Sequence, residues 1–209
     1  MKKIKIFFLL FILIILFTFT QVYSYTNIML EKLQSDILRL HIIGNSNLSS
    51  DQLFKLKCRD NIISYINSNI SPSSTKSEIM NFISNNINEI YTICYDTAKK
   101  ENINTTFNIE LTNSYFPTKY YGNITMPKGY YDCLKIEIGS SNGNNWWCSL
   151  FPPLCFSEVS VNLKDSKSSE SIITNTLSSE ESDLLLNSNS KPDIKLKFKL
   201  LEVLSQEIK

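Results

Sequence analysis

The N-terminal segment is the feature that most restricts how this chain can fold. Three lysines without an acidic residue precede an apolar run from Ile6 to about Phe19. A membrane-spanning helix normally needs ~20 apolar residues, so a run of about fourteen is more typical of a secretory signal peptide. A buried helix of a cytosolic protein is the weaker interpretation, because this run lacks any polar face. We therefore expect the chain to be exported.

The residues after the apolar run predict a cleavage site. Val22 and Ser24 place modest or small side chains at the two positions that signal peptidase reads, with the cut after Ser24. Tyr23 and Tyr25 make this site imperfect, so an uncleaved anchor is the alternative. Residues 1–24 are accordingly interpreted as a signal peptide. The remaining chain, about 185 residues (209 less 24), fits one domain.

The charge of the chain excludes one large class of partner. The formal net charge is +1 and three of the positive charges lie in the leader, so the remainder is slightly acidic. Binding to nucleic acid needs a cluster of Lys and Arg that displaces counterions. The sequence has no such basic stripe, and we therefore expect no nucleic-acid partner.

Hydrophobic periodicity predicts strands on either side of two long helices. Capping boxes of the Ser49-x-x-Gln52 and Thr75-x-x-Glu78 type predict helix starts, and the helices extend to about residues 69 and 100. Alternating apolar residues predict strands over the ranges 37–43, 107–111, 123–126, 134–138 and 146–151. This order predicts an α+β domain over residues 36–160, with a mainly antiparallel sheet covered on one face by helices.

The C-terminal part of the chain changes in composition. Residues 161–192 are rich in Ser, Asn, Glu and Lys and contain few large apolar side chains. Such a segment cannot offset the entropy lost on ordering, so it is predicted to be a flexible linker. Residues 193–209 again show helical spacing of apolar side chains and are predicted to form an amphipathic helix.

The sequence lacks the residue patterns of the common catalytic and metal sites. His41 is the single histidine, and no Gly-x-Ser-x-Gly motif accompanies it, so a structural or partner-facing role is favoured over that of a general base. Zinc sites need several His or Cys ligands at close spacing, and no Cys-x-x-Cys pair is present. We therefore predict no catalytic residue, no metal and no cofactor.

Five cysteines remain to be explained. Cys58 and Cys94 fall on the apolar stripes of the two helices, where a free thiol is a common small core residue. Cys148 and Cys155 are separated by six residues that include two prolines, which allows the chain to turn back on itself. A disulfide between them and two buried thiols are both consistent with the spacing, which fixes no distance.

Several long motifs resemble the stage II sporulation protein R family. The match covers about residues 36–156, with mild departures at Gly44, where alanine is expected, and at Cys58. It rests on residues 39–46 (RLHIIGNS), 51–52 and 56–60 (DQ, LKCRD), 116–123 (FPTKYYGN), 127–131 (PKGYY) and 139–156, which contains NWWC and FPPLCF.

The resemblance implies a signalling role without chemistry of its own. Members of this family are made in the forespore of endospore-forming bacteria and secreted into the space between forespore and mother cell. There they activate a membrane-embedded aspartic protease, stage II sporulation protein GA, which removes the prosequence of pro-sigma-E. The resemblance therefore favours a cleaved leader, because a released protein reaches the opposing membrane more easily.

The residues that contact the partner are a hypothesis drawn from this sequence rather than from the family. Two adjacent tryptophans in a strand point to opposite faces, so at most one fills the core on a given side. The candidate contact residues are Arg39, His41, Asn45, Trp146, Trp147, Phe151, Pro152 and Pro153. A secreted cell-wall hydrolase that uses His41 and a plain envelope-binding module are the alternative functions.

Overall fold

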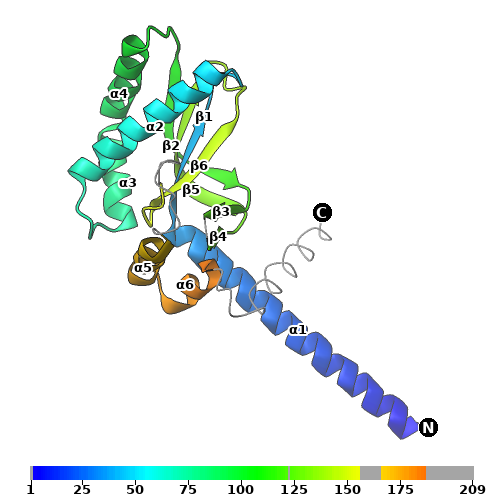
Figure 1. Cartoon of the computed structure of the whole chain (residues 1–209). Coiled ribbons are helices and arrows are strands. Elements are labelled where there is room, and N and C mark those ends of the chain that lie inside the picture. Colours follow the sequence, from blue (N-terminus) through cyan, green and yellow to red (C-terminus); the bar gives the residue numbers. More distant parts are fainter. Residues whose placement is uncertain (1, 122, 156–165, 187–209) are drawn as a thin grey trace.

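The computed structural model describes residues 2–121, 123–155 and 166–186 (Figure 1). The predicted amphipathic helix at residues 193–209 lies outside the described residues, as do both ends of the predicted linker. The described chain combines helices with a mostly antiparallel sheet, which confirms the predicted α+β class.

A four-stranded sheet forms the centre of the domain, with strand order β2-β5-β1-β6. Its strands are β1 (Leu38–Ile43), β2 (Phe107–Phe116), β5 (Gly129–Ile138) and β6 (Asn145–Phe151). The central pair β1 and β5 is parallel, with Leu40 opposite Leu134, and the other two pairs are antiparallel. A separate two-stranded sheet is formed by β3 (Lys119–Tyr121) and β4 (Ile124–Met126).

Three helices cover one face of the sheet, as Figure 1 shows. They are α2 (Ser49–Asn69), α3 (Lys76–Asn85) and α4 (Ile87–Lys100). Alternate residues of β1 point toward them and share a buried apolar cluster with α2 and α4. We call it the helix-side core, and its buried members include Leu38, Leu40, Ile42, Cys58, Ile62, Cys94, Leu134, Ile136 and Leu150.

The helix boundaries differ from the predictions in two places. The predicted second helix is divided at Asn86, whose backbone is not helical (φ −119°, ψ 23°). Its start is correct, because Thr75 and Glu78 form the predicted capping box. The capping box at Ser49 is wrong: Leu48 is the N-cap and has no side-chain cap bond. The Gln52 amide instead donates to the carbonyl of Ser46 at 2.7 Å.

A second apolar cluster lies on the opposite face of the sheet. Its cover comes from the C-terminal end of α1 (Lys2–Asp36), from β3 and β4, and from α5 (Ser166–Thr176) and α6 (Ser179–Leu185). We call it the leader-side core, and its buried members are Leu33, Ile37, Phe116, Ile124, Met126, Tyr131, Cys133, Leu154, Ile173, Leu177 and Leu185. In addition to the helix-covered face that the sequence predicts, part of the opposite face is therefore covered as well, whereas Lys135 and Glu137 form a partly exposed ion pair elsewhere on it.

The described part of the predicted linker is helical. Ser178 and Glu181 form a capping box at the start of α6, and Ile173, Leu177 and Leu185 are buried in the leader-side core. Composition alone underestimates how ordered this segment is. A few apolar side chains at helical spacing are enough to hold a helix when an existing apolar surface packs against them.

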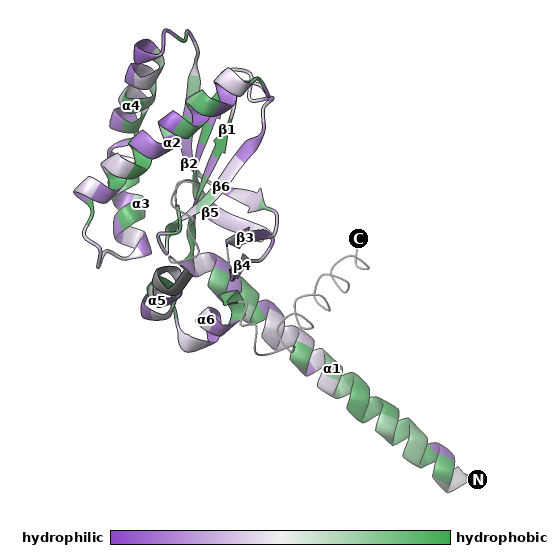
Figure 2. Ribbon diagram, viewed as in Figure 1, coloured by the Kyte–Doolittle hydropathy of each residue, from purple (hydrophilic) through white to green (hydrophobic). Residues whose placement is uncertain are grey.

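The part of helix α1 that projects from the domain is largely hydrophobic (Figure 2), in agreement with its unbroken apolar run. Among the described residues, it is the one helix that is long and apolar enough to cross a membrane. This property is consistent with the predicted signal segment. The last turns of the same helix belong to the domain, because Met29 and Leu33 are buried.

Candidate functional site

A buried arginine lies at the centre of the leader-side core, in contact with residues from several of the sequence motifs. Arg39 projects from β1 and is fully buried. Its Nε donates to the Cys148 carbonyl at 3.3 Å, and its Nη2 donates to the Tyr121 hydroxyl at 2.8 Å. The guanidinium carbon lies 4.3 Å from the ring centroid of Phe116 and 5.2 Å from that of Tyr131. We call Arg39, Phe116, Tyr121, Tyr131 and Trp147 the arginine cluster.

Tyr121 connects the arginine cluster to the edge of the sheet. Its hydroxyl accepts from Arg39 and donates to the Trp147 carbonyl at 2.8 Å. Burial lowers the pKa of Arg39 and raises the pKa of the Tyr121 hydroxyl. Among the described residues no carboxylate pairs with Arg39 and its Nη1 has no hydrogen-bond partner, so aromatic faces and neutral oxygens stabilise the cation.

His41 lies under Trp147, next to the arginine cluster. The two rings stack at 3.7 Å between centroids, and Phe116 meets His41 edge-on at 5.7 Å. The Nε2 atom is 2.8 Å from Oδ1 of Asn145, an arrangement in which a neutral imidazole donates from Nε2. His41 is thus buried and packed among aromatic rings.

We predict that acid destabilises the domain through His41. Burial, the largest cause, lowers the pKa of His41 below its ordinary 6.5, and the Asn145 hydrogen bond opposes this only in part. Just below pH 6.5, His41 is therefore protonated in the unfolded chain but still neutral in the folded chain. Neutral His41 therefore makes its full contribution to the free energy of unfolding above about pH 6.5. Below that pH the contribution decreases, by at most about 1.4 kcal/mol per pH unit.

Urea unfolding of the wild type and of His41→Gln, each at about pH 5 and about pH 7.5, measures this contribution. The wild type should lose more stability between the two pH values than the variant does. An equal loss in both proteins would assign the acid sensitivity to other groups.

The two tryptophans lie on opposite faces of β6, as predicted. Trp147 packs against the leader-side core, and Trp146 packs against the helix-side core. The guanidinium of Arg59, from α2, covers the Trp146 ring at 4.1 Å. Both tryptophans are half-buried and flank the outer strand of the sheet.

The turn that follows β6 is closed by covalent and backbone bonds. Cys148 and Cys155 form a disulfide with an S–S distance of 2.08 Å, so the bonded alternative holds in the structure. The Leu154 amide donates to the Ser149 carbonyl at 2.9 Å. Pro152 is buried and Pro153 is exposed at the tip of the turn.

The candidate contact residues do not form one surface. A register shift at Leu38 and Arg39 turns Phe151 toward the helix-side core, on the face opposite Trp147. Asn45 follows the other end of β1, opposite the start of β6 rather than its end. Arg39, His41 and Pro152 are buried, which leaves Asn45, Trp146, Trp147, Phe151 and Pro153 as the accessible members.

Asn45 instead joins the first motif to the last. Its side-chain amide donates to Asp51 at 2.8 Å, and its side-chain oxygen accepts from the Ser140 backbone at 2.9 Å. Hydrogen bonds from Ser46 and from Asn45 lower the pKa of Asp51, which keeps this acceptor charged. The loop after β1 and the loop between β5 and β6 are therefore locked together.

Sequence reasoning missed the aromatic members of the arginine cluster. Phe116, Tyr121 and Tyr131 belong to two of the motifs that resemble the family, but they lie between the strands that periodicity predicts at 107–111, 123–126 and 134–138. The available signal was the single buried-strand arginine, since a cation within an apolar strand needs aromatic or oxygen partners.

The fold and this cluster together define a class of protein: an α+β domain behind an apolar leader helix, organised around a buried arginine. Within the described residues, no group of three or more His, Cys, Asp or Glu side chains could hold a metal. A sequence model of the stage II sporulation protein R family matches residues 34–161, more than half of the chain. The chain belongs to the stage II sporulation protein R family.

One relative is a curated protein from Bacillus subtilis (strain 168), named Stage II sporulation protein R. It is 37% identical over 123 residues, which are 59% of this chain and 55% of the relative. The alignment thus spans little more than half of that protein's length. No solved structure matches the chain.

Proposed function

We propose that this chain is an exported signalling protein of sporulation. In this proposal it is exported from the forespore into the space between the forespore and mother-cell membranes, where it activates the membrane-embedded aspartic protease, stage II sporulation protein GA. The protease then processes pro-sigma-E in the mother cell. The observation that carries the proposal is the family match over residues 34–161, which contains every member of the arginine cluster.

Activation without catalysis requires that the ligand prefer one state of its receptor. A protein that binds the active state of the protease more tightly than the inactive state shifts the population toward the active one. The apolar leader helix supports export, and the disulfide at the end of β6 is of the kind that persists outside the cytosol.

The edge of β6 with which no described strand pairs is the contact region that we favour. An edge strand offers unpaired backbone groups to an incoming segment, and aromatic side chains on both of its faces can grip that segment. Trp146 and Trp147 supply such side chains, and the exposed Pro153 follows at the end of the strand. This region explains why adjacent tryptophans on opposite faces can serve one partner.

Direct binding tests the partner. The tagged full chain and the protease are produced in one non-sporulating host, and the chain is recovered from membranes dissolved in mild detergent. We expect the protease to be recovered with it. Recovery equal to that from cells without the tagged chain would exclude a stable complex.

We predict that Trp147→Ala weakens this binding. Buried tryptophans at interface centres contribute about 2 kcal/mol or more, which corresponds to roughly a thirtyfold rise in Kd. The matched control is Tyr95→Ala, which removes an exposed aromatic side chain of α4 on the helix-covered face. Urea unfolding verifies that the Trp147 variant is folded; a folded variant with the control's affinity would remove Trp147 from the contact region.

A further inference from the structure

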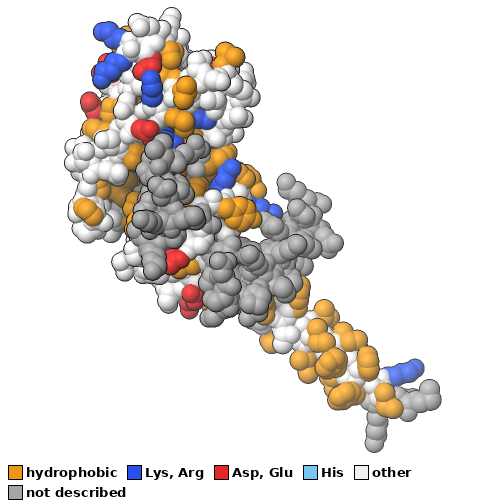
Figure 3. All heavy atoms as spheres, in the orientation of Figure 1, with side chains coloured by type: hydrophobic (Ala, Val, Ile, Leu, Met, Phe, Trp, Pro, Cys, Tyr) orange, Lys and Arg blue, Asp and Glu red, His pale blue; other side chains and the backbone are white. Residues whose placement is uncertain are grey.

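We propose that α1 is retained as a membrane anchor, so that the domain stays attached to the membrane across which it is exported. The lipid bilayer is the partner of the exposed apolar part of this helix. Figure 3 shows hydrophobic side chains gathered along the part of α1 that projects from the domain. The inference stands apart from the proposed protease partner, since it concerns what happens to the leader after export.

The uncharged length of α1 fits a bilayer. From residue 6 to residue 30 the chain carries no charged side chain, and all of these residues are helical. At ~1.5 Å per residue, about twenty residues span the ~30 Å hydrocarbon core. None of the most apolar window of the helix is buried against the protein. The helix therefore has the length of a spanning segment and no protein partner there among the described residues.

Three threonines near the end of the apolar run and beyond it are satisfied within the helix. Thr18 and Thr20 donate their hydroxyl hydrogens to the carbonyls of Ile15 and Phe17, at 2.9 and 2.8 Å. Thr26 donates in the same way to Val22 at 2.6 Å. A hydroxyl satisfied within its own helix is compatible with hydrocarbon, because no water is needed to complete its hydrogen bond. The membrane-compatible stretch therefore extends past the run of about fourteen residues that suggested a signal peptide.

The flanks of this stretch match a helix that crosses once. The lysines before residue 6 favour the cytoplasmic side for the N-terminus. Tyr23 and Tyr25 follow about one bilayer thickness later, at the level where amphipathic aromatic rings are enriched. The same two tyrosines make the cleavage site imperfect. The pattern thus predicts an anchor whose C-terminal end emerges on the far side.

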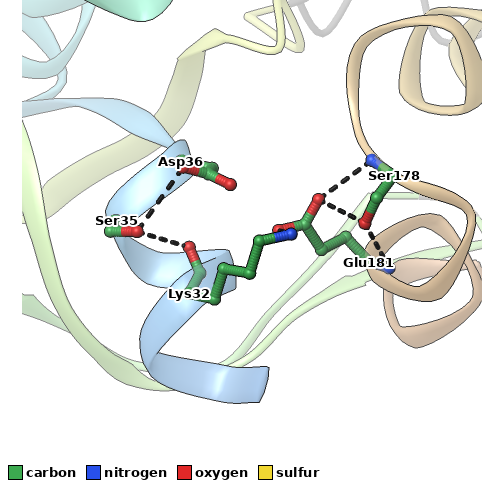
Figure 4. Close-up of polar contacts among 5 residues, drawn as sticks. All are labelled: Lys32, Ser35, Asp36, Ser178 and Glu181. Atoms are coloured by element: carbon green, nitrogen blue, oxygen red, sulfur yellow. Dashed lines mark hydrogen bonds and ion pairs between the residues drawn. The ribbon is translucent and has the colours of Figure 1, made fainter. Parts of the chain in front are cut away.

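The end of α1 is an integral part of the domain. Leu33 and Ile37 are fully buried in the leader-side core. Figure 4 shows Lys32 of α1 reaching Glu181 of α6, with 3.1 Å between the charged atoms. The Ser178 hydroxyl and backbone amide also donate to Glu181, which orients its carboxylate. The first residues after the predicted cut thus continue without a break into packed structure.

This continuity limits the distance between domain and bilayer. Ser24 and Met29 lie in the same helix, and the second is already buried. Five helical residues correspond to roughly 7–8 Å. A retained α1 would therefore hold the domain within about one headgroup layer of the membrane, where it can meet a receptor only across a narrow gap.

The mass of the exported protein decides the question. The full chain is produced in a bacterial host, membranes are washed with alkaline carbonate, and the N-terminal peptide and intact mass are determined. We expect an uncut chain of 24.1 kDa in the membrane fraction. The control carries Val22→Ala and Ser24→Ala, which improve the cleavage site, and it should be cut and released. A wild-type chain that begins at Tyr25 or leaves the membrane in the wash would overturn the proposal, and neither readout depends on protease activation.

Discussion

Replacing Arg39 with alanine is expected to lower the free energy of unfolding by about 3–5 kcal/mol, the range for large buried truncations. The substitution leaves a cavity among Phe116, Tyr131 and Trp147. It also removes the donors to the Tyr121 hydroxyl and the Cys148 carbonyl. Urea unfolding of the full chain in detergent measures the change.

Arg39→Met is the matched control for this prediction. Methionine fills most of the volume and carries no charge, so it avoids the burial of an unpaired cation. Because Arg39 has no carboxylate partner among the described residues, Arg39→Met should cost clearly less than Arg39→Ala. Equal losses would mean that the hydrogen bonds matter more than packing, and a loss below about 1 kcal/mol in the alanine variant would contradict the cluster's structural role.

Gly139→Ala is expected to cost about 2–4 kcal/mol, more than an ordinary surface change. Gly139 has φ +57°, in the left-handed region, and an added Cβ would lie 2.2 Å from Oδ1 of Asn45. Asn45 cannot simply move, because Asp51 and Ser140 hold its side chain. The substitution would therefore separate the two loops that the first and last motifs form.

Ser141→Gly provides the matched control in the same loop. Ser141 also has a positive φ, 55°, which glycine adopts without strain. The variant should be as stable as the wild type or slightly more stable. A Gly139→Ala protein with the stability of the Ser141→Gly protein would show that the interlocked loops are not important for the fold.

The sequence predicts the elements best where local patterns and packing agree. Leu38, Leu40 and Ile42 alternate in the sequence and do face the helices. The capping box at Thr75 and Glu78 forms as predicted, whereas Gln52 donates to the Ser46 carbonyl instead. A local motif therefore fails where the loop just before the helix offers a competing partner.

The site was harder to predict because it depends on contacts between distant residues. Arg39 meets Tyr121 and Cys148, which are 82 and 109 positions away along the chain. No periodicity within a strand indicates such a contact. Phe151 and Trp147 lie on different faces of the sheet because of a register shift, and no sequence pattern predicts that shift.

The length of the leader shows a different limit. Counting apolar side chains stops at about Phe19, but the hydroxyls of Thr20 and Thr26 beyond it are satisfied inside the helix. The same helix also contains Leu33, which is buried in the domain although the predicted domain begins only at residue 36.

Processing of pro-sigma-E in a non-sporulating host tests the proposed function most directly. The host carries the protease and its pro-sigma-E substrate, and the fraction of substrate cleaved is followed over time with this chain, without it, or with a version that lacks residues 2–24 and stays in the cytosol. The account predicts cleavage only with the exported chain. Cleavage at the same rate without the chain, or no cleavage when the exported chain is folded and present, would contradict it.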